Sequence, residues 1–250
     1  MELLILKEKV LYKSLFNTKN KKLAVLIDPD KQSEKELAQI SEKSQNDGAD
    51  FFLVGGSLVS SSLDFTIEII KKNSNIPVLL FPGSVLQISN KADGILLLSL
   101  ISGRNPNLLI GNHVIAAPIL KKSSLEIIST GYMLIDGGNK TSVEYMSNTK
   151  PIPANKADIA VATAIAGELL GNKLIYLEAG SGAKNHVSEN LIKEVKKSIN
   201  IPLIVGGGIS DIKKLDKICK AGADIIVTGT AFEKNSGLIK AFSEKIHSFN

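Results

Sequence analysis

Short apolar runs alternate with longer amphipathic segments along nearly the whole chain. Continuous apolar runs are typical of strands that are buried on both faces of a parallel sheet. The longer segments have the spacing of apolar positions that indicates helices covering such a sheet. Strands are predicted at residues 23–28, 51–54, 76–81, 94–99, 126–135, 174–177, 202–205 and 225–227. Helices are predicted at residues 3–16, 33–45, 58–72, 107–120, 154–170, 188–198, 211–220 and 231–247.

One connection in this series is too short to hold a helix. About ten residues separate Gly83 from the strand that begins at Gly94, whereas a parallel crossover needs a dozen or more. We therefore expect the third helix of the ring to be reduced to a loop. Eight strands that alternate with helices are typical of a TIM barrel, (β/α)₈, or of a doubly wound sheet. The length of 250 residues matches one barrel, so a single TIM-barrel domain over 1–250 with an extra N-terminal helix is predicted.

Charge and composition exclude several classes of function. The net charge of +5 comes from lysines spread along predicted helix faces, such as 193–197 and 213–217, which are expected to be solvated surfaces. A nucleic-acid partner is not expected, because the chain has one arginine and no tryptophan. Cys219 is the single cysteine and is expected to be a buried thiol, and the three histidines form no metal set. No run is long enough for stable membrane insertion, and residues 1–6 lack the layout of a signal peptide, so a cytoplasmic protein is predicted.

Small residues follow the last three predicted strands, at 180–182, 206–208 and 229–230. Glycines there let backbone N–H groups approach an anion. The second and third segments also lead into predicted helices, whose N-termini carry partial positive charge. Phosphate sites of TIM barrels commonly lie after strands seven and eight. The chain is therefore expected to handle a small phosphorylated molecule.

A candidate metal site lies at the ends of the first two strands. Asp28 ends the first apolar run, and Ser57 follows the second. A carboxylate and a hydroxyl on adjacent strands suit Mg²⁺, which takes few protein ligands together with substrate phosphates. Asp28-Pro29-Asp30 is also ordinary turn chemistry, so these residues alone leave open that they only shape a turn.

Two further positions carry candidate chemistry. Tyr176 and Glu178 lie on the same side of the sixth strand, and in a barrel both would point inward beneath the phosphate loops. Glu178 is then an acceptor for substrate hydroxyls or a base, and the alternative is a structural ion pair with a barrel lysine. Arg104 follows the fourth strand, where it would clasp a diphosphate or serve as a plain loop residue.

Five segments together resemble the geranylgeranylglyceryl phosphate synthase family, which includes the PcrB-type heptaprenylglyceryl phosphate synthases. The string Tyr-Leu-Glu-Ala-Gly-Ser-Gly is the most specific of them, and the resemblance covers essentially the whole chain. The family's barrel also lacks a regular third helix. The segment 183–187 departs from the archaeal pattern and points to the divergent bacterial or second archaeal group, which leaves the prenyl length open. The five segments are 28–31, 55–57, 176–182, 206–209 and 229–230.

The resemblance implies a prenyl transfer from an allylic prenyl diphosphate to the sn-3 hydroxyl of sn-glycerol 1-phosphate. It implies that Asp28 and Ser57 hold Mg²⁺, and that Glu178 and Tyr176 act in catalysis. Lys31 and Arg104 are diphosphate-binding candidates, and a homo-oligomer, either a dimer or a hexamer, is implied. The residues implied to bind glycerol phosphate are Tyr176, Leu177, Glu178, Ala179, Gly180, Ser181, Gly182, Gly207, Gly208, Gly229 and Thr230.

Two other functions share some of these features. Isomerases and thiamine-phosphate-type synthases carry the glycine edges, but not the 28–31 and 176–182 strings together. A non-catalytic barrel that binds phosphometabolites would not need Asp28, Ser57 and Glu178. For the prenyl tail, an apolar channel is expected among residues 96–100, 115–119 and 157–166.

Overall fold

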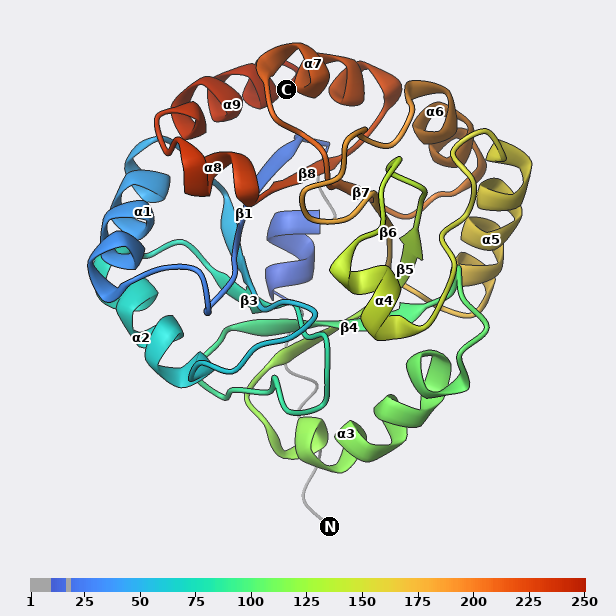
Figure 1. Ribbon diagram of the computed structural model, residues 1–250. Helices are drawn as coiled ribbons and strands as arrows, with labels where there is room; N and C mark the ends of the chain where they lie inside the picture. Colours follow the sequence, from blue (N-terminus) through green and yellow to red (C-terminus); the bar gives the residue numbers. More distant parts are fainter. Residues whose placement is uncertain (1–9, 17–18) are drawn as a thin grey trace.

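The computed structural model describes residues 10–16 and 19–250, and its centre is a closed barrel of parallel strands (Figure 1). The strands follow one another around the barrel in chain order, and the last pairs with the first. This closure confirms the predicted TIM barrel and excludes the doubly wound sheet. The strands are β1 (Lys22–Ile27), β2 (Phe51–Val54), β3 (Val78–Leu80), β4 (Gly94–Leu100), β5 (Glu126–Leu134), β6 (Leu174–Glu178), β7 (Leu203–Gly206) and β8 (Ile225–Thr228).

Helices surround this barrel, as Figure 1 shows. Local signals explain several of their starts: Ser33 and Glu36 form a reciprocal capping box, and Asp211 accepts the Lys214 N–H at the start of another helix. The helices are α1 (Glu34–Asn46), α2 (Leu63–Asn73), α3 (Asn112–Lys122), α4 (Ser142–Ser147), α5 (Ala157–Leu169), α6 (Glu189–Ser198), α7 (Ile212–Ala221), α8 (Thr230–Lys234) and α9 (Leu238–His247), with π-helical turns η1 (Tyr12–Phe16) and η2 (Asn107–Gly111).

The predicted loss of one helix is confirmed, because the described chain between β3 and β4 holds none. The Gln87 side chain fixes this connection instead. Its amide nitrogen donates to the Gly56 carbonyl at 2.8 Å, and its oxygen accepts the N–H groups of Gly56 and Gly83 at 3.3 and 3.2 Å. The connection is thereby tied to the loop that follows β2.

Three helix predictions need correction. The helix predicted at 58–72 begins only at Leu63, because Ser62 caps it. The helix predicted at 231–247 is two helices, α8 and α9, separated at 235–237. Helix α4 was not predicted, although Thr141 and Glu144 have capping-box spacing and the Thr141 hydroxyl accepts the Glu144 N–H. Of the helix predicted at 3–16, residues 3–9 lie outside the described residues, and 12–16 form η1.

Successive side chains of each strand point to opposite sides of the barrel wall and so belong to two different hydrophobic cores. Side chains on one side pack inside the barrel, where Phe16 of η1 meets Phe51 of β2 with ring centroids 5.5 Å apart. Those on the other side pack under the helices, together with Cys219, which is buried as predicted. Tyr176 belongs to the inner core and Leu177 to the outer one, which confirms the predicted inward direction of β6 positions 176 and 178. In the described chain, no helix has the length and apolar character to cross a membrane.

Candidate active site

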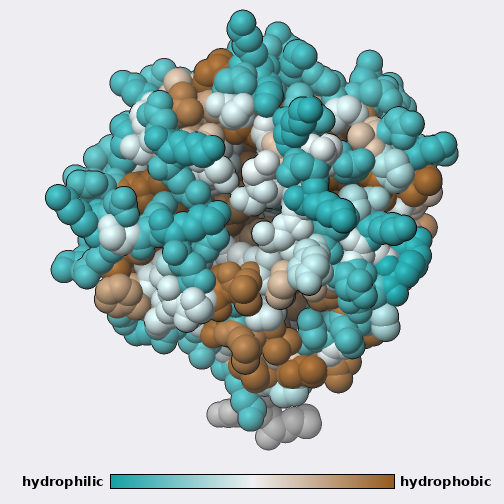
Figure 2. All heavy atoms as spheres, in the orientation of Figure 1, coloured by the Kyte–Doolittle hydropathy of each residue, from teal (hydrophilic) through white to brown (hydrophobic). Residues whose placement is uncertain are grey.

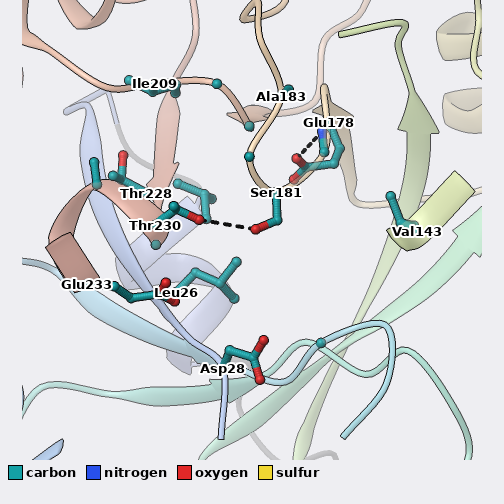
Figure 3. A pocket seen from close by; sticks show the side chains of 18 of the residues that line it. Leu26, Asp28, Val143, Glu178, Ser181, Ala183, Ile209, Thr228, Thr230 and Glu233 are labelled. Atoms are coloured by element: carbon teal, nitrogen blue, oxygen red, sulfur yellow. Dashed lines mark hydrogen bonds between the residues drawn. The ribbon is translucent and has the colours of Figure 1, made fainter. Parts of the chain in front are cut away.

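A cavity of about 510 Å³ opens at the carboxyl ends of the strands. Figure 3 shows Asp28, Glu178, Ser181, Thr230 and Glu233 arranged around it. Residues from the ends of several strands meet here because parallel strands of a barrel end on one face. The predicted site residues that line the cavity are Asp28, Lys31, Ser57, Glu178, Gly180, Ser181, Gly182, Gly207, Gly208, Gly229 and Thr230.

One wall of the cavity has the geometry of an anion-binding cup. Gly180, Gly182, Gly207 and Gly208 all have positive φ angles, between 69° and 98°. A Cβ atom on Gly207 would lie 2.4 Å from Glu178 Oε1, so only glycine fits there. Within the described chain, the N–H groups of Gly207 and Gly208 donate to no protein acceptor. These N–H groups are therefore available to an anion.

Two hydroxyls close this cup from the other side. The Ser181 and Thr230 oxygens lie 3.1 Å apart, which joins the loop after β6 to the start of α8. Gly229 precedes Thr230 and lines the same wall. The predicted grouping of these three glycine segments around one anion site therefore agrees with the geometry.

Glu178 is a buried carboxylate, 6% exposed, that faces the cavity. Its Oε1 atom accepts the Gly180 N–H at 2.6 Å. Burial raises the pKa of Glu178 to about 6, against the opposing effect of the Gly180 hydrogen bond. No ion pair among the described residues includes Glu178, which argues against the alternative of a structural pair with a barrel lysine.

Aromatic rings form the floor beneath this carboxylate. The Tyr132 and Tyr176 centroids are 5.2 Å apart, and Phe81 lies 5.5 Å from Tyr176 and 5.8 Å from Tyr132. Burial, reinforced by the Glu178 charge, raises the pKa of both tyrosines well above its usual value. Tyr176, Leu177 and Ala179 do not line the cavity, whereas Tyr132 does. Tyr132 was missed from the sequence, although it pairs in register with Tyr176.

Asp28 and Asp30 have different environments. Asp28 lines the cavity, and its Oδ2 atom lies 3.3 Å from Lys31 Nζ. Asp30 points instead to the loop after β2, where hydrogen bonds from Ser61 and Ser60 lower its pKa to about 2. Asp30 therefore shapes the turn, and Asp28 is left for chemistry in the cavity.

Glu233 of α8 was not anticipated as a site residue. It lines the cavity, and its Oε1 atom lies 3.7 Å from Lys31 Nζ, so Lys31 bridges Asp28 and Glu233. Burial raises the pKa of Glu233, and the Asp28 charge adds to the effect of burial. In the sequence, Glu233 is a helical glutamate four residues after Gly229, and nothing distinguishes it from a glutamate on a solvated helix surface.

The ends of β1 and β2 offer hard oxygen atoms to a metal ion. Asp28 presents a carboxylate, and Ser57 presents a hydroxyl in the neighbouring loop. Among the described residues, no three His, Cys, Asp or Glu side chains form a group that can hold a metal. One carboxylate and one hydroxyl suit Mg²⁺, which keeps waters and takes its other ligands from substrate phosphates.

A second cavity, of about 370 Å³ and mostly apolar, adjoins the first. Ser57, Phe81, Tyr132 and Val143 line both. The second cavity lies where the third helix of the ring is missing, between residues 82–88 and α3. On the face shown in Figure 2, apolar residues gather near α3 and the loop after β3.

The predicted tail channel agrees with this cavity in part. Leu97, Leu98 and Leu100 line it, as does Ala116 of α3. Ile115 and Ile119 are exposed and do not line it, and neither does the helix at 157–166. The lining also includes a residue without a predicted role, His113, whose Nε2 atom lies 3.3 Å from Ser99 Oγ.

Arg104 lies apart from both cavities. Its Nη1 atom donates to the carbonyl oxygens of Gly103, at 2.8 Å, and Ile101, at 3.4 Å. The guanidinium is thus engaged by its own loop, as the plain loop alternative described. The structure does not bring Arg104 together with the other diphosphate-binding candidate, Lys31.

Comparison with known proteins gives a consistent result. A family model described as the PcrB family matches residues 16–246. The geranylgeranylglyceryl phosphate synthase of Chitinophaga pinensis is 52% identical over 91% of each chain, and that of Spirosoma linguale is 50% identical over 92% of this chain and 93% of its own. The crystal structure of (S)-3-O-geranylgeranylglyceryl phosphate synthase from Thermoplasma acidophilum, in complex with sn-glycerol-1-phosphate, is similar with a TM-score of 0.88 and 36% identity, covering 92% of this chain and 94% of that chain.

Proposed function

This chain belongs to the PcrB family, and we propose that it joins geranylgeranyl diphosphate to the sn-3 hydroxyl of sn-glycerol 1-phosphate. It is a prenyltransferase that acts on glycerol phosphate. The proposal rests on one observation: two cavities share a wall, and one of them contains the anion cup while the other is mostly apolar. A phosphorylated acceptor and an apolar donor tail would meet at that wall.

Glycerol phosphate fits the larger cavity with its phosphate on the glycine cup. Gly207, Gly208, Gly229 and Thr230 surround the anion, and the loop at 180–182 closes over it. Phosphate bound there leaves the glycerol hydroxyls directed toward the interior, where Glu178 is the buried acceptor. The acceptor hydroxyl is thereby oriented before the reaction begins.

Glu178 receives the proton that the reaction releases. The sn-3 oxygen forms a bond to C1 of the prenyl chain as the C1–O bond to diphosphate breaks, and the hydroxyl proton passes to the Glu178 carboxylate. The pKa of about 6 leaves this group mostly ionised at neutral pH and more basic than an ordinary carboxylate. Tyr176 contributes indirectly, because its ring packs against Tyr132 and Phe81 beneath the reacting atoms.

The prenyl tail fits the apolar cavity, with its diphosphate at the shared wall near Ser57. Asp28 and Ser57 would hold Mg²⁺ there, and Lys31 lies beside Asp28 to bind diphosphate oxygens. Bound Mg²⁺ would neutralise the diphosphate leaving group as its bond to the allylic carbon breaks. Leu97, Leu98 and the face of α3 that lines the cavity would exclude water from the prenyl tail.

We extend the proposal to assembly and location: a cytoplasmic homo-oligomer, either a dimer or a hexamer. Tyr145, Leu169 and Leu170 are each more than 80% exposed, and apolar side chains of this kind are candidates for burial by self-association. Light scattering coupled to size-exclusion chromatography would test the assembly, and a monomeric mass would refute it.

A coupled assay for released diphosphate tests the reaction. We expect diphosphate only when glycerol phosphate, prenyl diphosphate and Mg²⁺ are all present. Donors of 15, 20 and 35 carbons would be compared, with the 20-carbon donor expected to be used best. Binding of glycerol phosphate without diphosphate release from any donor would instead favour a barrel that only binds phosphometabolites.

A further inference from the structure

We propose that Lys214 binds the phosphate of glycerol phosphate, as the cationic member of a cup otherwise built from backbone N–H groups and hydroxyls. This inference rests on the proposed function. It assigns a substrate-binding role to a side chain that the charge pattern placed on a solvated helix face.

Lys214 is positioned by the first turn of α7. Its own N–H donates to the Asp211 side chain at 3.0 Å, which fixes the helix start. Its side chain lines the larger cavity and is only partly exposed, whereas that of its neighbour Lys213 is exposed and does not line the cavity. The helix therefore turns one of two adjacent lysines toward the site.

The ammonium group of Lys214 is held against the glycine cup itself. Lys214 Nζ donates to the Gly208 carbonyl at 3.3 Å and to the Ser210 hydroxyl at 3.1 Å. An ammonium group has three protons, so two neutral acceptors leave one for an anion. The carbonyl that holds Lys214 belongs to Gly208, whose N–H is available to the same anion.

The other lysines that line the cavity differ from Lys214. Lys31 is shared between the carboxylates of Asp28 and Glu233, on the metal side of the cavity. Lys234 lines the cavity as well but is exposed, whereas Lys214 is only partly exposed. No carboxylate among the described residues forms an ion pair with Lys214 within 4 Å, although Asp211 on the same helix turn contributes a negative field. Among the described residues, the Lys214 ammonium group therefore has no ion-pair partner that would compete with a ligand beside Gly207 and Gly208.

A charge-assisted contact to phosphate is stronger than one from neutral donors. We therefore expect Lys214→Met to raise KM for sn-glycerol 1-phosphate by about 10- to 100-fold. The KM for prenyl diphosphate and kcat at saturating glycerol phosphate should change less than about threefold, because the lost contact lies far from the reacting carbon. Lys213→Met is the matched control and should leave all three constants unchanged.

Calorimetric titration with sn-glycerol 1-phosphate and with inorganic phosphate gives a measure that does not depend on turnover. The Lys214→Met variant should bind both ligands more weakly by the same factor, and Lys214→Arg should regain most of the affinity. Equal affinity in the wild-type and Lys214→Met proteins would overturn the inference, as would a loss confined to kcat. If the wild-type protein binds glycerol phosphate but makes no prenyl product, the proposed function fails while the Lys214 comparison still stands. If the Lys214→Met protein does not fold, the Lys214→Gln protein takes its place in the same titration, with the same weaker binding of both ligands expected.

Discussion

The Oε1 atom of Glu178 lies 2.6 Å from the Gly180 nitrogen, so the buried carboxylate at the end of β6 is fixed by the loop that closes the anion cup. Phosphate binding and proton transfer are thus assigned to adjacent parts of one short segment, 176–182. Under the proposed function, a substrate with its phosphate in the cup would have its hydroxyls next to a base that is already oriented.

Replacing Glu178 by Gln tests its role as the proton acceptor. The amide keeps the size of the side chain but cannot take the proton, so we expect kcat to fall by about 100-fold or more. Single-turnover measurements with preformed donor complex would give this rate directly. A variant with the wild-type rate would reduce Glu178 to a structural residue.

The pH dependence of the reaction should follow the same carboxylate. Because burial raises the pKa of Glu178 to about 6, kcat/KM should rise as the pH increases through about 6. In Glu178→Gln, this rising limb should disappear from the residual activity. A wild-type profile that is flat between pH 5 and 7 would contradict the assignment.

The raised pKa also makes a prediction about stability. The folded protein holds the Glu178 proton more tightly than the unfolded chain does. The contribution of this protonation to the free energy of unfolding is therefore complete below pH 4.5 and is lost as the pH rises through about 6. A shift of that size corresponds to about 2 kcal/mol. Urea unfolding of the wild-type protein and of Glu178→Gln at pH 4.5 and 7.5 would measure the difference. An equal difference at both pH values would be inconsistent with the raised pKa.

Asp28→Ala should abolish the requirement for Mg²⁺ together with at least about 99% of turnover, because the leaving group loses its metal. Titration with Mg²⁺ in the presence of inorganic diphosphate should show weaker binding to this variant. Asp30→Ala serves as the control: it removes the contacts to Ser60 and Ser61 but should retain Mg²⁺ binding. Unchanged metal dependence in Asp28→Ala would refute the site.

Gly207→Ala should damage both stability and glycerol phosphate binding. The added Cβ would lie 2.4 Å from Glu178 Oε1 and 2.6 Å from the Gly180 nitrogen, at a φ of +82°. Gly171 is the matched control, with a φ of +89° and no atom near an added Cβ. We expect Gly171→Ala to cost about 1–2 kcal/mol from backbone strain alone, and Gly207→Ala to cost clearly more in chemical denaturation. Equal costs would show that the cup is not tightly packed.

Ala116→Phe should obstruct the apolar cavity, since Ala116 is buried on the side of α3 that lines it. We expect KM for geranylgeranyl diphosphate to rise about tenfold or more, with little change for glycerol phosphate. Ala117→Phe, at an exposed position that does not line the cavity, should behave as the wild type. Equal donor KM values for the two variants would place the tail elsewhere.

The fold was largely predictable because its signals are local. A buried parallel strand such as 51–54 reads as an apolar run, and the missing helix follows from counting residues between Gly83 and Gly94. The break between α8 and α9 was missed, because residues 235–237 interrupt a helical pattern that continues on both sides. Helix α4 was missed because it is only six residues long.

The site was predictable where residues lie at strand ends or directly after them, as Glu178 and Asp28 do. Tyr132, Glu233 and Lys214 could not be found in that way. The position of Tyr132 depends on the register of β5 against β6, and the positions of Glu233 and Lys214 depend on how α8 and α7 are rotated about their axes. Contacts with the rest of the fold set this register and these rotations. Arg104 shows the converse: a residue of suitable chemistry just beyond a strand whose side chain is engaged by its own loop.

The most direct test of the central claim is isolation of the product from labelled sn-glycerol 1-phosphate and geranylgeranyl diphosphate with Mg²⁺, with sn-glycerol 3-phosphate in a parallel reaction. We predict a geranylgeranylglyceryl phosphate ether from the first isomer and none from the second. No ether from sn-glycerol 1-phosphate, or equal yields from the two isomers, would contradict this account.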